Sequence, residues 1–214
     1  RIWVAGCSTG EEAYSLAICL LEYLDNQPIK PLIQIYATDI SERAINTARA
    51  GFYKHSAVAD VSPERLQRFF VPVDGGYRIG KSIREMCVFA RQNICSDPPF
   101  SKLDLITCRN VLIYLRAALQ KKILPTFHYG LKPTGFLMLG SSETTGDSSD
   151  LFTAVDKKQK IYARKLAPAR LALDLIANHT SELVNPTPSG DPGWSDFDLQ
   201  KEADRIVLER LAPV

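Results

Sequence analysis

The feature that most constrains this chain is an alternation of apolar runs and helix-like stretches in its first fifty residues. Residues 2–5 (IWVA) are an apolar run, and apolar positions recur at helical spacing over 11–24. The apolar run 32–40 (LIQIYATDI) follows, and Ser41 is then placed to cap a helix that Gly51 closes. Strand, helix, strand and helix in this order predict a parallel sheet with right-handed crossovers.

The same alternation of strand and helix patterns resumes after about residue 100. Residues 103–108 (LDLITC) and 135–143 (GFLMLGSSE) have the composition of buried strands, with a turn, KPTG, before the second. Between them lies a helical pattern over 115–131, which Pro125 must kink or split. Residues 151–165 contain two extended segments that can pair antiparallel and complete the sheet.

Two regions depart from the alternation. Residues from about 52 to about 90 combine a short capped helix, a DGGY turn and short strands, so we expect a small antiparallel insertion subdomain. After Lys165 the sequence NPTPSGDPG is typical of a linker, and 197–211 has the pattern of an amphipathic helix. We therefore expect one α/β domain over 1–165, and over 166–214 a helical tail that leads to a following domain absent from this chain.

Composition excludes several classes of function. The net charge of +2 is too small to argue for nucleic acid, and no run of apolar residues is long enough to enter a membrane. The five cysteines form no CxxC pair and no Cys/His cluster with zinc spacing, so we expect no metal. Reduced thiols of this kind suit a cytoplasmic protein.

Polar residues follow several expected strands, at the edge where an open parallel sheet binds its ligands. They are the Gly6–Gly10 loop, Asp39, Asn93, and Arg109–Asn110 with Tyr114 just beyond. The loop has neither GxGxxG spacing nor a Walker lysine, and Glu11 and Glu12 at the following helix start would repel a phosphate. Plain turn chemistry explains the glycines equally well.

Asp39 indicates what the ligand carries instead of phosphates. An acid at the end of the second strand can accept both hydroxyls of a ribose, although it can also cap a helix. Because Ser41 is available as the cap, we favour the ribose interpretation. A ribose approached by carboxylates suggests an adenosyl ligand that bears a cation, which is S-adenosylmethionine; Glu11 and Glu12 suit its amino and sulfonium side.

The sequence also resembles a known family over roughly residues 1–165. The segments STGEEAYSLA, YATDIS, ARAGFY, SPERLQRFF, CRNVLIY, LKPTGFLMLGSSE and IYARK occur in the same order in CheR-type chemotaxis receptor methyltransferases. This resemblance implies a class I methyltransferase fold, which is a Rossmann-like, mostly parallel sheet. It also implies methyl transfer from S-adenosylmethionine to glutamate carboxylates, with S-adenosylhomocysteine as product. The tail resembles the connection to a PAS-type sensor in hybrid signalling proteins.

The resemblance carries roles to particular residues. Arg109 and Tyr114 of CRNVLIY would lie near the transferred methyl group, and either Glu11 or Glu12 would hold the cofactor. Asn93 and Ile94 would meet the adenine, and Asp39 the ribose. The cofactor-binding residues implied in full are Ala5, Gly6, Glu11, Glu12, Asp39, Ile40, Asn93, Ile94, Arg109 and Asn110. Arg109 as a surface ion pair and Tyr114 as a core aromatic remain the simpler alternatives.

The expected partner is the cytoplasmic helical region of a chemoreceptor, with glutamyl methyl esters as the product groups. A coupled sensor domain beyond the carboxyl terminus would be a second partner, while nucleic acid and membrane are not expected. One alternative is an inactive S-adenosylmethionine-binding module of a hybrid signalling protein, but it would not need to keep Arg109 and Tyr114. A methyltransferase for a small carboxylic acid or for RNA fits the fold equally well, though the RNA version lacks a basic stripe.

Overall fold

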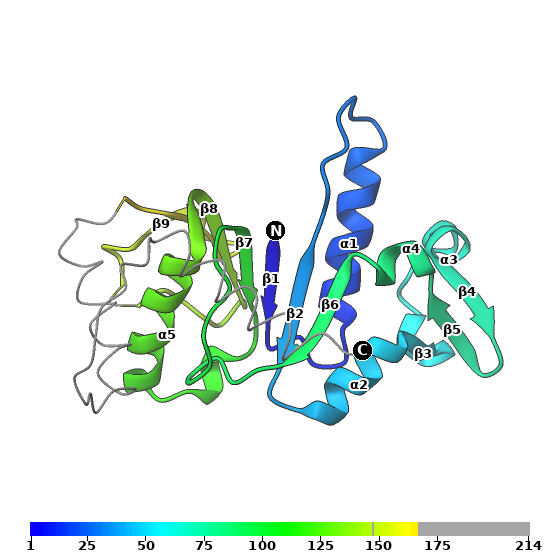
Figure 1. The fold of residues 1–214 in the computed structure, drawn as a ribbon, viewed down its shortest axis with the longest axis horizontal. Coiled ribbons are helices and arrows are strands. Elements are labelled where there is room, and N and C mark those ends of the chain that lie inside the picture. Colours follow the sequence, from blue (N-terminus) through cyan, green and yellow to red (C-terminus); the bar gives the residue numbers. More distant parts are fainter. Residues whose placement is uncertain (147, 167–214) are drawn as a thin grey trace, which may run out of the picture.

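A computed structural model describes residues 1–146 and 148–166 of the chain, and in it a seven-stranded sheet carries the fold (Figure 1). The strand order is β6-β2-β1-β7-β8-β10-β9. The five strands from β6 to β8 are mutually parallel, whereas β10 is antiparallel to both β8 and β9. These strands are β1 Ile2–Ala5, β2 Ile35–Asp39, β6 Cys87–Arg91, β7 Leu103–Cys108, β8 Leu131–Leu139, β9 Phe152–Asp156 and β10 Ile161–Arg164.

Helices cover both faces of this sheet. Alternate residues of β1 point to opposite faces, so Val4 joins a core cluster with α1 and α2 while Trp3 joins a second cluster with α5. The indole N–H of Trp3 donates to Thr38 Oγ1 at 2.9 Å, which satisfies the one polar group that this buried ring carries. The helices and short 3₁₀ turns are α1 Glu11–Leu24, α2 Glu42–Ala50, η1 His55–Val58, α3 Pro63–Phe69, α4 Lys81–Arg84, η2 Leu112–Tyr114 and α5 Ala117–Gly130.

The expected helix signals of α2 are confirmed. Ser41 Oγ accepts from the backbone N–H of Ala44 at 3.3 Å, and Gly51 ends the helix with φ 58°. The same device starts α3, where Ser62 Oγ accepts from the N–H of Arg65. Pro125 does not split α5, which runs as one helix through it. The expected antiparallel pairing within 151–165 is confirmed by β9 and β10.

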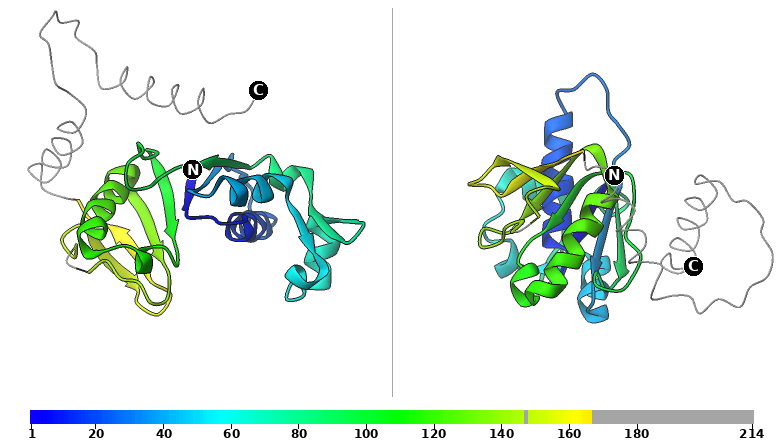
Figure 2. Two further views of the ribbon diagram at one scale, coloured as in Figure 1. Left: turned by 90° about the horizontal axis from the view of Figure 1, so that it is seen from below. Right: turned by 90° about the vertical axis from the view of Figure 1, so that its left-hand side faces the viewer.

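A three-stranded antiparallel sheet forms the insertion, in the order β3-β5-β4. Its strands are β3 Phe52–Lys54, β4 Phe70–Val73 and β5 Gly76–Ile79. Figure 1 shows it beside α1 and α4, on the opposite side of the central strands from α5. Viewed from below, it lies at the opposite end of the molecule from α5 (Figure 2, left).

Two expectations about strands are wrong. The insertion does not extend to about residue 90, because Cys87–Arg91 is the edge strand β6 of the main sheet, paired in parallel with β2. Its apolar run CVFA is typical of a parallel strand buried on both faces. The segment KPTG is not a turn, because Lys132–Gly135 lies within β8, where the register against β7 shifts between Leu103 and Leu105. The expected linker and amphipathic helix within 166–214 fall outside the described residues, apart from Leu166.

Candidate functional site at the carboxyl edge of the sheet

The predicted site residues all follow the carboxyl ends of parallel strands. Ala5 ends β1, Asp39 ends β2 and Cys108, just before Arg109, ends β7. Asn93 follows β6, whose last residue pairs with Asp39. The topology therefore gathers these segments at one edge of the sheet, as the sequence predicted.

The glycine loop is the centre of this edge. Gly6 and Gly10 have φ angles of 77° and 93°, which only glycine adopts readily, and Gly10 directly precedes α1. A Cβ on Gly6 would lie 2.3 Å from Val111 Cγ2. The loop after β1 and the loop after β7 therefore interlock, and the bare backbone at Gly6 is required by that close approach.

The two glutamates at the start of α1 point in different directions. Glu11 accepts the hydroxyl of Thr9 at 2.6 Å and is exposed. Tyr53 of the small sheet donates its hydroxyl to the Thr9 carbonyl at 2.8 Å, which ties the insertion to this loop. Glu12 is instead turned towards β7, where its Oε2 lies 3.7 Å from Arg109 Nη1.

Asp39 has a structural role besides the one predicted for it. Its Oδ2 accepts from the backbone N–H of Ser8, and its Oδ1 from the N–H of Ser41, each at 2.9 Å. Ser41 caps α2 as expected, so the Asp39 carboxylate is not needed as the helix cap and instead clamps the glycine loop to β2. Each carboxylate oxygen can accept more than one hydrogen bond, so the half-buried Asp39 keeps the capacity to receive a hydroxyl.

Negative charge accumulates around the glycine loop. Burial, and then the charges of Asp39, Glu11 and Glu12, raise the pKa of Cys7 to about 12. The Cys7 thiol therefore stays protonated near neutral pH and is not a nucleophile. A surface with three carboxylates beside an open glycine turn favours a cationic ligand and disfavours a phosphate.

Asn93 and Ile94 lie in a turn after β6. The backbone N–H of Gln92 donates to the Asp39 carbonyl at 3.0 Å, so this turn begins against the end of β2. Asn93 Oδ1 accepts from the N–H of Cys95 at 3.0 Å, and Ile94 packs against the Trp3 core cluster. Ile40 is 62% exposed at the same edge, which is where an apolar ring could lie.

The CRNVLIY segment forms the fourth part of the edge. Arg109 is exposed and paired with Glu12, and Asn110 has a φ of 57°, a conformation that asparagine tolerates better than most residues. Tyr114 lies in η2 and is 81% exposed, so the core-aromatic alternative is wrong. Arg109 does form an ion pair at the surface, as the simpler alternative expected. Its partner, Glu12, is itself a predicted cofactor-binding residue, so the ion pair is compatible with a role in the site.

Sequence reasoning missed Glu143, which is 4% exposed and lies just after β8. Its carboxylate accepts hydrogen bonds from backbone N–H groups of the CRNVLIY segment. The rule that singled out Asp39, an acid after a parallel strand, applies equally to Glu143 and could have found it.

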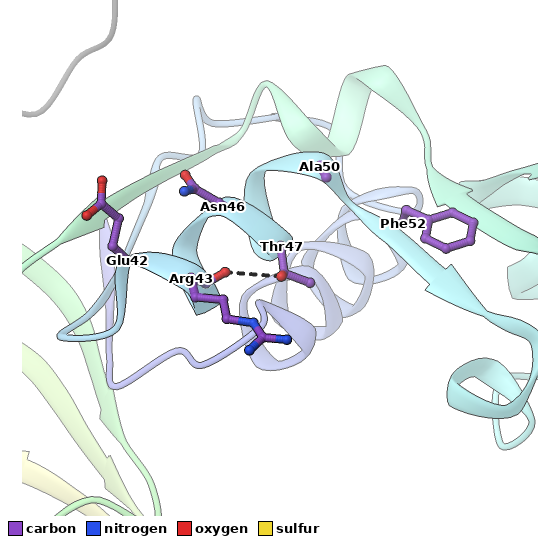
Figure 3. A pocket seen from close by; sticks show the side chains of 6 residues that line it. All are labelled: Glu42, Arg43, Asn46, Thr47, Ala50 and Phe52. Carbon is purple, nitrogen blue, oxygen red and sulfur yellow. Dashed lines mark hydrogen bonds between the residues drawn. The ribbon is translucent and has the colours of Figure 1, made fainter.

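A hollow lies away from this edge of the sheet. It has a volume of about 690 Å³ on the outer side of α2 and contains none of the predicted site residues (Figure 3). It is lined by Glu42, Arg43, Asn46, Thr47, Ala50 and Phe52. Within the described parts of the chain, no group of three or more His, Cys, Asp or Glu side chains is placed to hold a metal ion, and none of the helices is long and apolar enough to cross a bilayer.

Comparison with known proteins identifies relatives that match most of this chain. The chain is 40% identical over 188 residues to an uncharacterized 104.1 kDa protein of Rhodobacter capsulatus encoded in the hypE 3′ region, a match that covers 88% of this chain and 19% of that protein. It is 39% identical over 169 residues to chemotaxis protein methyltransferase 1 of Pseudomonas aeruginosa, with 77% of this chain and 62% of that protein covered. The chain thus spans less than two thirds of the length of either relative.

A solved structure of a SAM-dependent methyltransferase from Methanosarcina mazei is similar with a TM-score of 0.39 at 17% identity, covering 83% of this chain and 77% of that one. This score is too low to add to the topology described above. The family model for the CheR methyltransferase SAM binding domain matches residues 1–161, most of the 214-residue chain. That match, together with the relative in Pseudomonas aeruginosa, shows that the chain belongs to the CheR methyltransferase family.

Proposed function

We propose that this chain is the catalytic domain of a protein-glutamate O-methyltransferase that acts on chemoreceptors in the cytoplasm. The observation that carries the proposal is the pairing of Glu12 with Arg109 at the carboxyl edge of the sheet, beside the glycine loop and Asp39. This arrangement combines acceptors for a cationic nucleoside with a guanidinium for a substrate carboxylate. Chemotaxis methyltransferases among the relatives support the choice of substrate.

The residues present fit S-adenosylmethionine. Glu12 is the better candidate to hold the amino group, because its carboxylate faces the CRNVLIY loop whereas that of Glu11 is engaged by Thr9. Asp39 would accept the ribose hydroxyls, with Asn93, Ile94 and Ile40 around the adenine. The bare turn of Ala5 and Gly6, with Asn110 across from it, would form the floor of the site.

The chemistry requires little acid–base assistance. When bound, S-adenosylmethionine supplies a methyl carbon on a sulfonium, and a substrate glutamate oxygen forms its bond to that carbon as the carbon–sulfur bond breaks. A glutamate side chain with a pKa of about 4.3 is already ionised at neutral pH, so no proton has to be removed. The work left to the protein is to align an anion with a cation and to limit their contact with water.

Arg109 would orient the substrate carboxylate by a forked contact. A guanidinium that held this carboxylate with its full charge would also make the oxygen a weaker nucleophile. Because Glu12 partly neutralises the charge of Arg109, the guanidinium can position the substrate carboxylate and still leave its oxygen nucleophilic. Tyr114, exposed in η2, would place its ring and hydroxyl on the substrate side of the site.

The experiment is methyl transfer from S-adenosylmethionine with a labelled methyl group to the cytoplasmic fragment of a chemoreceptor. We expect base-labile labelled methyl esters on glutamate, a large loss of this product in Arg109→Ala, and retained S-adenosylhomocysteine binding in that variant. Binding of S-adenosylhomocysteine without any methyl transfer would favour the inactive-module alternative. Transfer to RNA or to a free carboxylic acid, and none to the receptor, would contradict the proposed substrate.

A further inference from the structure

Glu143 makes an unusual set of contacts for a buried acid. Its side chain is 4% exposed, and its two carboxylate oxygens accept hydrogen bonds from five backbone N–H groups. The donors are Asn110 at 3.0 Å, Val111 at 2.8 Å, Leu112 at 2.7 Å, Ile113 at 3.4 Å and Gly140 at 2.7 Å. Four of these donors belong to the loop that carries Arg109 and Tyr114.

The fold brings this acid to the loop in a defined way. Leu139 at the end of β8 pairs with Cys108 at the end of β7, so the chain segments that follow the two strands start side by side. The backbone N–H of Glu143 donates to the Gly140 carbonyl at 3.0 Å, which closes a tight turn after β8. This turn directs the Glu143 side chain back under the 109–114 loop.

The lack of a side chain at Gly140 makes room for the Glu143 carboxylate and for Asn110. A Cβ at Gly140 would lie 2.6 Å from Glu143 Oε2 and 2.7 Å from Asn110 Oδ1. Both distances are shorter than real Cβ contacts, so any side chain here would displace the carboxylate or the asparagine. The absence of a side chain at Gly140 therefore permits the contact between Glu143 and the loop.

The loop that Glu143 holds also supports the glycine loop. Val111 Cγ2 occupies the space where a Cβ of Gly6 would lie, and Asn110 has the left-handed conformation that turns the chain from β7 into η2. Arg109, the residue before this turn, reaches Glu12 of α1. A displacement of Asn110 and Val111 would thus alter both the guanidinium and the floor of the proposed cofactor site.

An ionised carboxylate suits this position better than any other side chain of its size. It has only acceptor oxygens, with about four lone-pair sites, whereas a glutamine would present an NH₂ group to backbone donors. A buried N–H left without an acceptor costs about 1–3 kcal/mol, so the loop would move rather than keep its conformation.

We propose that Glu143 is a positioning residue, which fixes the 109–114 loop through its backbone N–H groups and thereby places Arg109 and the floor of the cofactor site. This inference rests on the proposed function, because it concerns the efficiency of the same site. Glu143 does not face the substrate and takes no part in the methyl transfer itself. Its effect is transmitted through Asn110 and Val111.

The test uses the 214-residue chain and two variants that disturb the same contact from opposite sides. Glu143→Gln alters the acceptor, and Gly140→Ala crowds both the Glu143 carboxylate and Asn110 without changing the charge of the site. Glu85→Gln is the matched control for the loss of an acid, because Glu85 is an exposed residue of the α4 region. Ile83→Val is the control for stability, because it removes one methyl group from the other core cluster.

Two measurements are made under conditions in which every variant is fully folded. The first is hydrogen exchange at the amides of Asn110, Val111 and Leu112, which we expect to be at least about tenfold faster in both Glu143→Gln and Gly140→Ala than in the controls. The second is calorimetric titration with S-adenosylhomocysteine, where we expect the dissociation constant to rise about tenfold in these two variants. If Glu143 served only the stability of the fold, Glu143→Gln and Gly140→Ala would show the same exchange rates and dissociation constants as Ile83→Val.

The two proposals fail in different ways. If Glu143→Gln and Gly140→Ala match the controls in both exchange and affinity, Glu143 does not position the loop. If the unaltered chain does not bind S-adenosylhomocysteine, the proposed function is wrong, and the exchange measurement still decides whether Glu143 holds the loop. If Glu143→Gln does not fold, Glu143→Asp, which keeps the charge but is one methylene shorter and so withdraws the oxygens from the loop, is measured in its place, with the same increase in exchange expected.

Discussion

Glu12 Oε2 lies 3.7 Å from Arg109 Nη1, which joins the start of α1 to the end of β7 across the edge of the sheet. The two residues are 97 positions apart in the chain, and the sequence analysis assigned one to the cofactor and the other to the reacting group. Their side chains are 23% and 43% exposed, so the pair is open enough for a ligand amine or carboxylate to join it.

The first prediction distinguishes the two glutamates of the STGEE segment. Glu12→Gln should raise the dissociation constant of S-adenosylhomocysteine about tenfold, because it removes a charged acceptor from the cofactor amine and from Arg109. Glu11→Gln is the matched control and should change it about twofold or less, because Glu11 is exposed and engaged by Thr9. Calorimetric titration measures both. The opposite ranking would show that Glu11 holds the cofactor.

The second prediction concerns Asp39 and the ribose. The unaltered chain should bind S-adenosylhomocysteine more tightly than its 2′-deoxy analogue, because a hydroxyl that hydrogen-bonds a carboxylate is lost. Asp39→Asn keeps the size of the side chain but removes its charge and one of the two oxygens that accept from Ser8 and Ser41, and it should reduce this preference to about twofold or less. Equal preference for the two ligands in both proteins would contradict the ribose role and leave Asp39 only its contacts with Ser8 and Ser41.

The third prediction tests the interlocking of the two loops. Gly6→Ala should lower the free energy of unfolding by about 2–4 kcal/mol, because its Cβ would overlap Val111 Cγ2 and its φ is 77°. Gly75→Ala is the control: its φ is 80° but nothing lies within 4 Å of the added Cβ, so it reports the backbone strain alone, about 1 kcal/mol.

Removal of the Val111 methyl groups should then restore part of the free energy of unfolding that Gly6→Ala loses. Gly6→Ala combined with Val111→Ala should be less destabilised than the sum of the two single changes, by at least about 1 kcal/mol. Urea unfolding measures all four variants. Strict additivity would mean that the two loops do not constrain each other.

The fourth prediction is a pH dependence at His128. This residue is 3% exposed, and its Nε2 donates to the Lys165 carbonyl at 2.8 Å. Burial lowers the pKa of His128 below its ordinary value of 6.5. Between the two pKa values the unfolded chain binds the proton more readily, so the free energy of unfolding falls as the pH drops below about 6.5.

The matched variant is His128→Gln, which can still donate a hydrogen bond but does not titrate. Its free energy of unfolding should fall less than that of the unaltered chain between about pH 7.5 and about pH 5.5. Urea unfolding at these two values gives the comparison. Carboxylates such as Asp104, whose pKa lies below its ordinary value despite burial, lose their stabilising effect at lower pH and contribute equally to both proteins.

Much of the fold could be predicted because local signals and topology agreed. Ser41 and Gly51 delimit α2 as expected, and the parallel order of β1, β2 and β7 follows from the alternation of strands and helices. The sequence places Cys87–Arg91 in the insertion because this strand follows the insertion directly, with only the short helix α4 between β5 and β6. The cofactor class was predicted from Asp39 and the two glutamates, and the family match confirms S-adenosylmethionine.

The position of the candidate residues at one edge of the sheet was predicted, but the contacts between them were not. Sequence indicates which strand ends carry polar residues, and the topology then brings them to one edge. It does not indicate that Glu12 rather than Glu11 turns towards Arg109, because that depends on how Thr9 and Tyr53 arrange the loop. The support given by Glu143 to Asn110 and Val111 was not predicted either, since it involves backbone N–H groups rather than a pattern of side chains.

The most direct test compares two adenosine compounds, one that carries an amino group and one that carries phosphates. Calorimetric titration of the unaltered chain with S-adenosylhomocysteine and, separately, with ADP measures whether the edge formed by Gly6, Glu12, Asp39 and Arg109 selects an amine or a phosphate. We expect S-adenosylhomocysteine to bind at one site per chain and ADP not to bind. Binding of ADP without binding of S-adenosylhomocysteine would contradict the proposed site.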